Sequence, residues 1–191
     1  MGGMNINRKL VGSVGDDLDQ RFVTPYDVGW GFLVNFNHEF TGKEALQKIA
    51  ENPSRIVTTL EWNAEDVGAV FASMFKPGET ACDDISKPSD LPLIENSFNG
   101  CTEYRADKVL SGDQEIGITT GRIISYPYNS MISLAFIQPE FAVEGTQVSV
   151  LWGTPGTPQM KIRATVSKYP YNKDLIRNED KDVTEIPEFQ F

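Results

Sequence analysis

The sequence predicts a mostly β protein of the α+β class: a C-terminal antiparallel β-barrel of about six strands, preceded by a short strand–helix segment. From residue 102 onward, short runs of alternating apolar residues are separated by turns of glycine and proline, which is typical of a closed or nearly closed barrel. Before that point, two runs carry apolar residues at helical spacing. With 191 residues, 40% of them hydrophobic, the chain can bury one ordinary core, or one core with an appendage.

The N-terminal part begins with extended segments. Residues 1–23 show weak periodicity and are expected to form an extended lead-in. Residues 24–37 predict a strand with one strongly apolar face, because large apolar side chains alternate there. The alternating residues are Trp30, Phe32, Val34 and Phe36. Such a stripe could stack on a flat heterocycle, but it is more often part of a core.

A first helix is predicted over residues 41–52. Thr41 and Glu44 have the spacing of a capping box at its start. The proline after Asn52 ends the helix. Its buried stripe would consist of Ala45, Leu46, Ile49 and Ala50.

A second strand–helix unit follows. Residues 55–62 predict a strand, and Asn63 is the expected cap of the next helix. The apolar residues of this helix at helical spacing are Val67, Val70, Phe71, Met74 and Phe75. Residues 78–102 predict an irregular connection that packing on another part could order. Asp83 and Asp84 in this connection are interpreted as solvated surface charges.

The barrel strands are predicted after this connection. They span residues 104–125 (two strands with a turn at 111–113), 131–137, 146–153 and 159–171. The inward faces of the last two would carry Val148, Val150, Trp152, Met160, Ile162, Ala164 and Val166. A sharp turn over residues 138–146 separates two of these strands, and residues 172–191 are expected to form a loose acidic tail.

The composition argues against several classes of partner. A net charge of −10 repels phosphate backbones, so binding to nucleic acid or to an anionic membrane surface is disfavoured. No apolar run reaches the roughly 18 residues that cross a bilayer. Two cysteines, Cys82 and Cys101, do not make a disulfide framework, so a cytoplasmic protein with free thiols is expected. A zinc site is not expected, since there is one histidine and no CxxC motif.

The residues supply no complete catalytic set, and two places remain as candidate sites. His38 is the only histidine, so any Ser/His/Asp or Cys/His site would have to use it; a solvated loop residue is the competing interpretation. Arg122, Tyr126 and Tyr128 lie where a predicted strand ends, and a cation with two phenols could hold a carboxylate and an aromatic ring. The competing interpretation is a surface turn stiffened by Pro127.

Two stretches resemble the aminomethyltransferase family, the T-protein of the glycine cleavage system and its relatives. The first contains "TPYDVGWGF" and "FTGKEAL", and the second contains "SLAFIQPEFAVEGTQVSV" and "KIRATVSKYPY". "LEWNAEDV", "SMISLA" and "VLWG" look more like the tetrahydrofolate-dependent aryl-methyl-ether O-demethylases of the vanillate and syringate type. The similarity covers residues 24–75 and 102–171.

The resemblance implies the C-terminal domain of a tetrahydrofolate-dependent transferase of methyl or aminomethyl groups, inactive alone, because family members are much longer. This domain would pack on and partly close the folate site. Residues 1–53 would be the tail end of a folate-binding domain, residues 54–171 the T-protein-like barrel, and residues 172–191 the loose tail. A missing N-terminal region would bind most of the tetrahydrofolate, and a small molecule would donate the methyl group.

Five residues of this chain are expected near that folate site, and none is assigned a catalytic role. They are Trp30, His38, Arg122, Tyr126 and Tyr128. Two alternatives stay open: a non-catalytic binding or assembly module that pairs with a separately encoded catalytic subunit, and a non-catalytic folate-binding protein. If a partner domain is missing, an exposed apolar patch should remain near Trp30 or the 78–102 connection.

Overall fold

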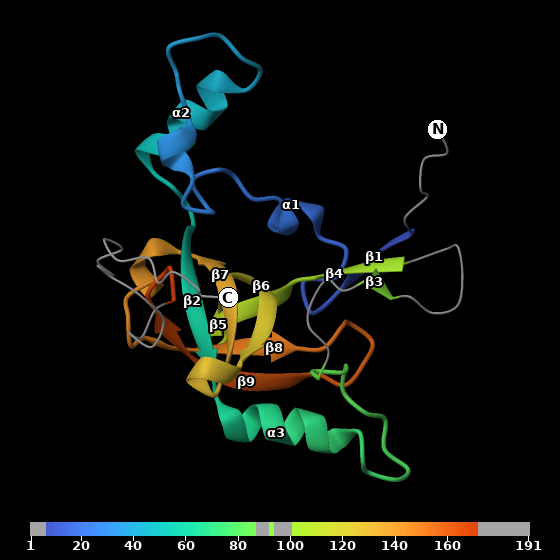
Figure 1. Ribbon diagram of the computed structural model, residues 1–191. Coiled ribbons are helices and arrows are strands. Elements are labelled where there is room, and N and C mark those ends of the chain that lie inside the picture. The colour runs from blue at the N-terminus through green and yellow to red at the C-terminus, as the bar shows by residue number, and fades with distance from the viewer. Residues whose placement is uncertain (1–6, 87–91, 94–100, 172–191) are drawn as a thin grey trace, which may run out of the picture.

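A closed barrel of antiparallel strands forms the body of the molecule, as the sequence predicts (Figure 1). The computed structural model describes residues 7–86, 92–93 and 101–171, so the predicted tail lies outside the described residues. The barrel strands are β2 Ile56–Trp62, β5 Asp107–Ser111, β6 Gln114–Ser125, β7 Ser130–Ile137, β8 Gln147–Trp152 and β9 Met160–Ser167. Their order is β2-β7-β6-β5-β8-β9, and β9 pairs with β2 to close the barrel.

Side chains from alternate strand positions fill the barrel interior. The predicted inward faces of β8 and β9 are confirmed, with Val148, Val150, Trp152, Ile162, Ala164 and Val166 all buried. The rings of Trp62 and Trp152 meet edge to face, with their centroids 5.8 Å apart. The barrel is therefore a packed core and not an open channel.

The helix α3, Ala64–Ser73, packs next to β9 on the lower side of the barrel in Figure 1. Asn63 is its N-cap, as predicted, and the Asn63 Oδ1 accepts a hydrogen bond from the Asp66 N–H at 3.1 Å. Val70 is buried, whereas Phe75 of the predicted apolar stripe is exposed. The helix therefore packs through a narrower face than its sequence predicts.

A small second sheet stands beside the barrel. β1, Asn7–Val11, pairs in parallel with β4, Cys101–Arg105, and β3, Pro92–Leu93, pairs with β4 in the antiparallel sense. The sequence did not predict this sheet, because β4 runs into β5 with only Ala106 between them. The Ala106 carbonyl accepts a hydrogen bond from the Val14 N–H at 3.2 Å. The lead-in is therefore held against the barrel at this point.

Residues 24–37 do not form the predicted strand. They follow a helical turn α1, Leu18–Arg21, and fold into turns and a short 3-10 helix η1, Gly31–Leu33. Trp30 and Phe32 are 58% and 81% exposed, so the interpretation of this stripe as core is wrong. An alternating run forms a strand only when another strand pairs with it, and none of the described strands does so here.

The first predicted helix is present as α2, Lys43–Glu51, and it stands away from the barrel (Figure 1). Its cap differs from the prediction, because Gly42, with φ of +89°, occupies the N-cap position in place of Thr41. No residue of α2 is buried. The predicted apolar stripe, which includes Leu46 and Ile49, therefore reaches no core within the described residues.

The connection after α3 is only partly described. Residues 78–86 follow an irregular path, as predicted, and Cys82 and Ile85 are buried against the barrel core. The barrel itself therefore holds this part of the connection. No helix in the described ranges has the length and apolar character needed to cross a bilayer.

Candidate functional site

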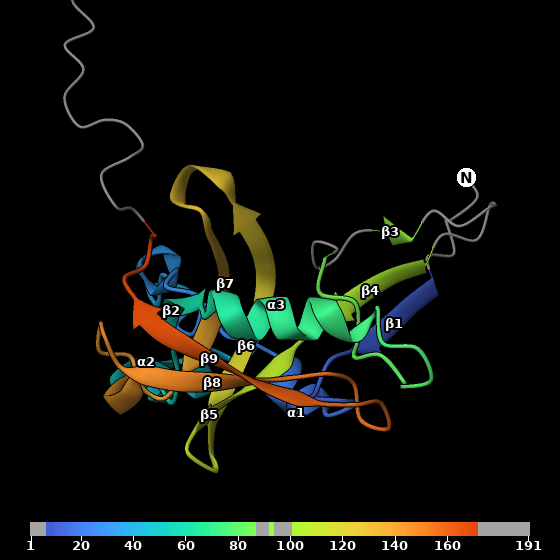
Figure 2. The same ribbon diagram turned by 90° about the horizontal axis from the view of Figure 1, so that it is seen from below.

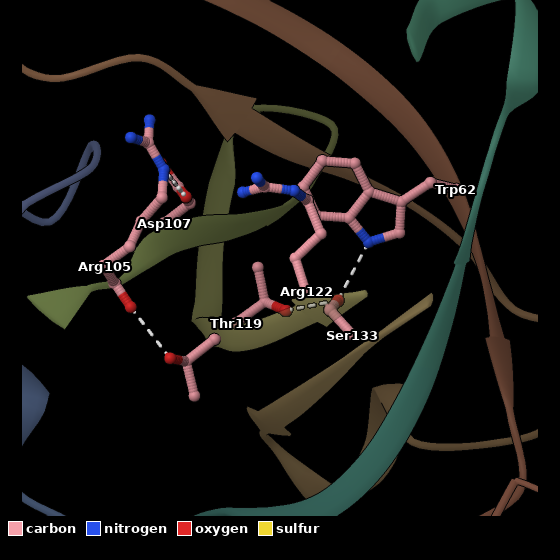
Figure 3. A pocket seen from close by; sticks show the side chains of 7 residues that line it. Trp62, Arg105, Asp107, Thr119, Arg122 and Ser133 are labelled. Atoms are coloured by element: carbon pink, nitrogen blue, oxygen red, sulfur yellow. Dashed lines mark hydrogen bonds and ion pairs between the residues drawn. The ribbon is translucent and has the colours of Figure 1, made fainter. Parts of the chain in front are cut away.

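A small polar cavity lies inside the barrel (Figure 3). Its lining residues are Trp62, Arg105, Asp107, Thr119, Thr120, Arg122 and Ser133. The room for the centre of a water-sized sphere is about 10 Å³, which is near the minimum for a single water molecule. Pockets for organic ligands have volumes of roughly 300–1,000 Å³. The cavity is therefore too small to hold such a ligand.

Two arginine side chains lie on the ring of the fully buried Trp152. The Cζ atom of Arg105 is 3.6 Å from the ring centroid, and the Cζ atom of Arg122 is 4.7 Å from it. The indole N–H of Trp152 donates to the backbone carbonyl of Asp83 at 2.9 Å. Cation–π attraction is strengthened when the partners are shielded from water, so this ring fixes both guanidinium groups.

Two carboxylates balance these two positive charges. Arg105 donates to the Oδ2 of Asp83 at 2.8 Å and to the Oδ2 of Asp107 at 2.9 Å. Asp107 also accepts a hydrogen bond from the Ser13 N–H at 3.0 Å, and Asp83 accepts one from the Thr154 hydroxyl at 2.7 Å. The cluster therefore joins the lead-in, the connection after α3 and the barrel without needing an external anion.

The two carboxylates respond differently to this environment. Burial raises the pKa of Asp107, although Arg105 and the Ser13 N–H oppose it. Burial acts in the same direction on Asp83, but hydrogen bonds from Thr154 and Arg105 outweigh it, and the pKa of Asp83 is lowered. Asp83 is thus held as an ionised partner, and its interpretation as a solvated surface charge is wrong.

A chain of hydroxyl groups completes the cavity wall, as Figure 3 shows in part. The Trp62 indole N–H donates to the Ser133 Oγ at 2.8 Å, and the Ser133 and Thr119 hydroxyl oxygens are 2.6 Å apart. Thr119 donates its single hydroxyl hydrogen to the Leu134 carbonyl at 2.7 Å. The Ser133 hydroxyl must therefore donate to Thr119. Both hydroxyl hydrogens are committed, so neither group is poised as a nucleophile.

The path of β6 explains why Arg122 points inward. The pairing register between β6 and β7 shifts between Thr120 and Ile123, and Gly121 adopts φ of +61° within this bulge. A β-bulge re-aims side chains next to it. Arg122 is only 6% exposed as a result. The placement of Arg122 on a surface loop is therefore wrong.

The arrangement suits anchoring better than catalysis. In the described part of the chain, no three His, Cys, Asp or Glu residues are grouped so that they could hold a metal ion. Arg105, Asp107, Thr119 and Ser133 are engaged in hydrogen bonds, and the cavity is close to full. We conclude that the cluster around Trp152 fixes the lead-in and the connection after α3 to the barrel.

Comparisons with known proteins identify relatives of the chain. No protein-family model matches it. Sesamin methylene transferase from Sinomonas sp. is 46% identical over 183 residues, which are 96% of this chain and 40% of that protein. Syringate O-demethylase from Sphingobium sp. is 34% identical over 83% of this chain and 34% of its own length. An aminomethyltransferase from Thermotoga maritima is 29% identical over 52% of this chain and 26% of its own length.

The chain is related to the aminomethyltransferase family over part of its relatives' length. The resemblance predicted from the sequence is confirmed, including the similarity to O-demethylases. The chain spans less than half the length of these curated relatives.

The five residues that the family resemblance suggested do not form a single cluster. Trp30 is exposed before η1, and His38 is exposed in the loop before α2, where its ring lies 5.3 Å from that of Phe40. Tyr126 is 81% exposed at the turn between β6 and β7. Tyr128, in the same turn, packs edge to face on Tyr171, with centroids 4.8 Å apart. Arg122 lies apart from these four, inside the barrel.

Sequence reasoning missed most of the cluster around Trp152. Arg105 and Asp107 are two residues apart in a run with strand-like alternation, so their side chains are expected on the same face of the strand. This spacing could have predicted that the two side chains form an ion pair. Asp83 had no comparable signal, because its partners Arg105 and Thr154 lie far from it in the sequence.

Exposed apolar side chains gather in one stretch, which we call the N-terminal apolar segment, residues 18–33. Leu18, Phe22, Trp30, Phe32 and Leu33 are 51% to 81% exposed. Isolated exposed apolar residues are ordinary, whereas several together mark an interaction surface. The set includes Trp30, near which an exposed apolar patch is expected if a partner domain exists.

Proposed function

We propose that this chain is the C-terminal domain of a tetrahydrofolate-dependent transferase of one-carbon units, methyl, methylene or aminomethyl. It packs on an N-terminal folate-binding region, partly closes the folate site and is inactive alone. The names of the relatives support the reaction class, since they include a methylene transferase, an O-demethylase and an aminomethyltransferase.

The observation that carries this proposal is that the large apolar side chains of the N-terminal apolar segment are exposed and that no residue of α2 is buried. Residues 12–14 are bonded to the barrel, and Arg55, directly before β2, pairs with the buried Asp27 of the intervening segment at 3.2 Å. Between these points the chain makes an excursion whose large apolar side chains face water. A helix with no buried residue gains little from tertiary packing. A further domain packed on this excursion accounts for both features.

The proposed domain division follows from the same excursion. Residues 1–53 are the tail end of the folate-binding domain, and residues 54–171 are the barrel domain that closes it. The boundary is not a flexible linker. Arg55 also donates to the backbone carbonyls of Gln20 and Phe22, at 2.9 and 2.7 Å.

The N-terminal region binds most of the tetrahydrofolate in this proposal. The cavity of the barrel does not fit a pterin, because it has room for about one water molecule. Trp30, His38, Tyr126 and Tyr128 have exposed or half-buried rings that could contact the cofactor from the side of this chain. Arg122 does not contact the cofactor in this proposal. From inside the barrel it fixes β6, the strand that leads to Tyr126 and Tyr128.

An aromatic ether is the proposed one-carbon donor. Two of the relatives are named for sesamin and syringate, which are both aromatic compounds. The chemistry needs positioning of the donor and protonation of the leaving oxygen. The described cluster supplies neither group, so we assign the donor site to the N-terminal region.

A chimera tests the proposed function. The segment of sesamin methylene transferase that matches this chain is replaced by this chain, and transfer of the one-carbon unit from sesamin to tetrahydrofolate is measured. We expect the chimera to be active, the same protein without any C-terminal segment to be inactive, and this chain alone to show no tetrahydrofolate binding by calorimetry. Tight binding of tetrahydrofolate by this chain alone would contradict the proposal.

Two matched variants show whether the N-terminal apolar segment is the contact. Phe32→Ser in this segment should lower the activity of the chimera, because Phe32 is 81% exposed and would lie in the interface. Phe75→Ser, at a residue 70% exposed just beyond α3, should leave it unchanged. Equal effects of the two variants would rule out this segment as the specific contact.

A further inference from the structure

The outer end of the β6–β7 hairpin leaves the barrel. We call residues 121–131 the hairpin tip. β5 pairs with β6 only as far as Thr119, and β2 pairs with β7 only from Ile132 onward. Beyond these residues the two strands have only each other as partners, and Figure 2 shows them projecting from the barrel. A two-stranded ribbon of this kind is marginally stable by itself.

Both faces of the hairpin tip are apolar. Successive residues of a strand point to opposite faces. Ile123 and Ile124 are nevertheless both exposed, by 54% and 44%, and Tyr126 at the turn is 81% exposed. A ribbon lying on the surface of a domain would bury one of its faces. This one presents isoleucine to water on each.

Apart from the buried Arg122 at its base, the tip also lacks charge. Residues 123–139 contain no Asp, Glu, Lys or Arg, although 23% of the whole chain is charged. Exposed strand edges are usually protected by charged side chains, especially lysine. The cores of protein interfaces, in contrast, are depleted of charge and enriched in tyrosine. The composition of the tip matches an interface core.

Contacts at both ends of the tip make it rigid: Arg122 lies at its base, and Tyr128 and Asn129 lie in its turn. Arg122 is fixed on the Trp152 ring at 4.7 Å, and Tyr128 packs on Tyr171 at 4.8 Å. Asn129 closes the turn in the left-handed conformation, with φ of +49°. A pre-organised element loses little conformational entropy when it binds.

We propose that the hairpin tip is a wedge that inserts between two surfaces of the N-terminal region of the same enzyme. This inference rests on the proposed function and names a second contact, separate from the N-terminal apolar segment. The matched sesamin methylene transferase has 40% of its length in common with this chain, so a large region remains to enclose the tip. A second copy of this chain fits less well, because two bodies with a net charge of −10 repel each other.

Hydroxyl-radical footprinting tests the wedge in intact proteins. The labelling of Tyr126 is compared between this chain alone and the full-length chimera with the N-terminal region of sesamin methylene transferase. We expect protection of Tyr126 by about tenfold or more in the chimera, because its exposed ring would move into an interface core. Val143, which is 61% exposed in the connection between β7 and β8, is the control and should label equally in both.

The outcomes separate the wedge from the proposed function. If Trp30 and Phe32 are protected in the chimera while Tyr126 is not, the wedge is refuted and the domain contact survives. If none of the three is protected, the proposed function fails as well. If Tyr126 is already protected in the chain alone and becomes labelled on dilution, a second copy occupies the tip and the wedge is refuted.

A pair of charge insertions gives an independent readout. Ile123→Glu with Ile124→Glu should lower the activity of the chimera by about 10- to 100-fold, the cost of failing to bury one or two isoleucine side chains. Val143→Glu should have no effect. Because all three side chains are exposed, the chain alone should keep its melting temperature in each case. Unchanged activity of the double variant would refute the wedge.

Discussion

Trp152 organises the charged residues inside the barrel. Its ring carries Arg105 and Arg122, and its indole N–H holds the backbone of Asp83. Through the two arginines it determines the position of both carboxylates and of the hairpin base. A single buried aromatic residue thus connects segments that are far apart in the sequence.

Asp83→Asn should reveal the pH dependence of this cluster. The pKa of Asp83 in the folded protein lies below its ordinary value of 3.8, so the ionised group stabilises the fold above about pH 4. That contribution is lost as the pH falls through the lowered value. We expect the difference in free energy of unfolding between wild type and variant to shrink on acidification, as measured by urea unfolding. A constant difference would show that the charge of Asp83 is not involved.

At the scale of elements, a stripe of apolar residues is buried in one element and left without a core in another. The stripe of β8 is buried in the barrel, whereas the stripe of α2 meets no core in the described residues. The β6–β7 hairpin shows both situations within one element. Its inner part is barrel, and its outer part carries isoleucine and tyrosine into solvent.

The stability of the chain alone should therefore depend on where a leucine lies. Leu60→Ala in β2 should lower the free energy of unfolding by about 2–5 kcal/mol, because Leu60 is fully buried and the change leaves a cavity. Leu46→Ala in α2 should lower it by less than about 1 kcal/mol, because no residue of α2 is buried. Thermal or urea unfolding of the two variants checks this contrast. A large loss for Leu46→Ala would show that α2 packs on this chain itself.

Among the described residues, a rigid barrel body has the small second sheet beside it and carries two parts that project with exposed apolar side chains. The barrel is closed and its core is filled. Figure 1 shows the excursion that contains α2 extending from this body, and Figure 2 shows the hairpin tip extending from it. Both carry exposed apolar side chains, which is the distribution expected of one part of a larger enzyme.

Limited trypsin digestion should separate the body from the excursion. Lys48 on α2 and Lys161 on β9 are both exposed, so access alone does not distinguish them. Cleavage requires local unfolding, which is easier in a helix without buried contacts than in a barrel strand. We expect trypsin to cut at Lys48 before it cuts at Lys161 in this chain, and we expect Lys48 to become protected in the full-length chimera. Earlier cleavage at Lys161 would contradict this division.

The sequence by itself determined the repeating features. The barrel strands, the turn at residues 111–113 and the Asn63 cap follow from period, turn chemistry and local hydrogen bonding, which short segments carry within themselves. The resemblance to the aminomethyltransferase family followed from motifs in a fixed order along the chain.

Only the tertiary structure decided which apolar faces meet a core and where the charges lie. Alternation shows that Trp30 and Phe32 are spaced like a strand, but pairing depends on a distant neighbour, and none of the described strands pairs with them. Arg122 points inward because of a bulge, and Asp83 is ionised beside Arg105 because residues far apart in sequence meet inside the barrel. Burial and pairing are properties of long-range contact, and no local pattern contains them.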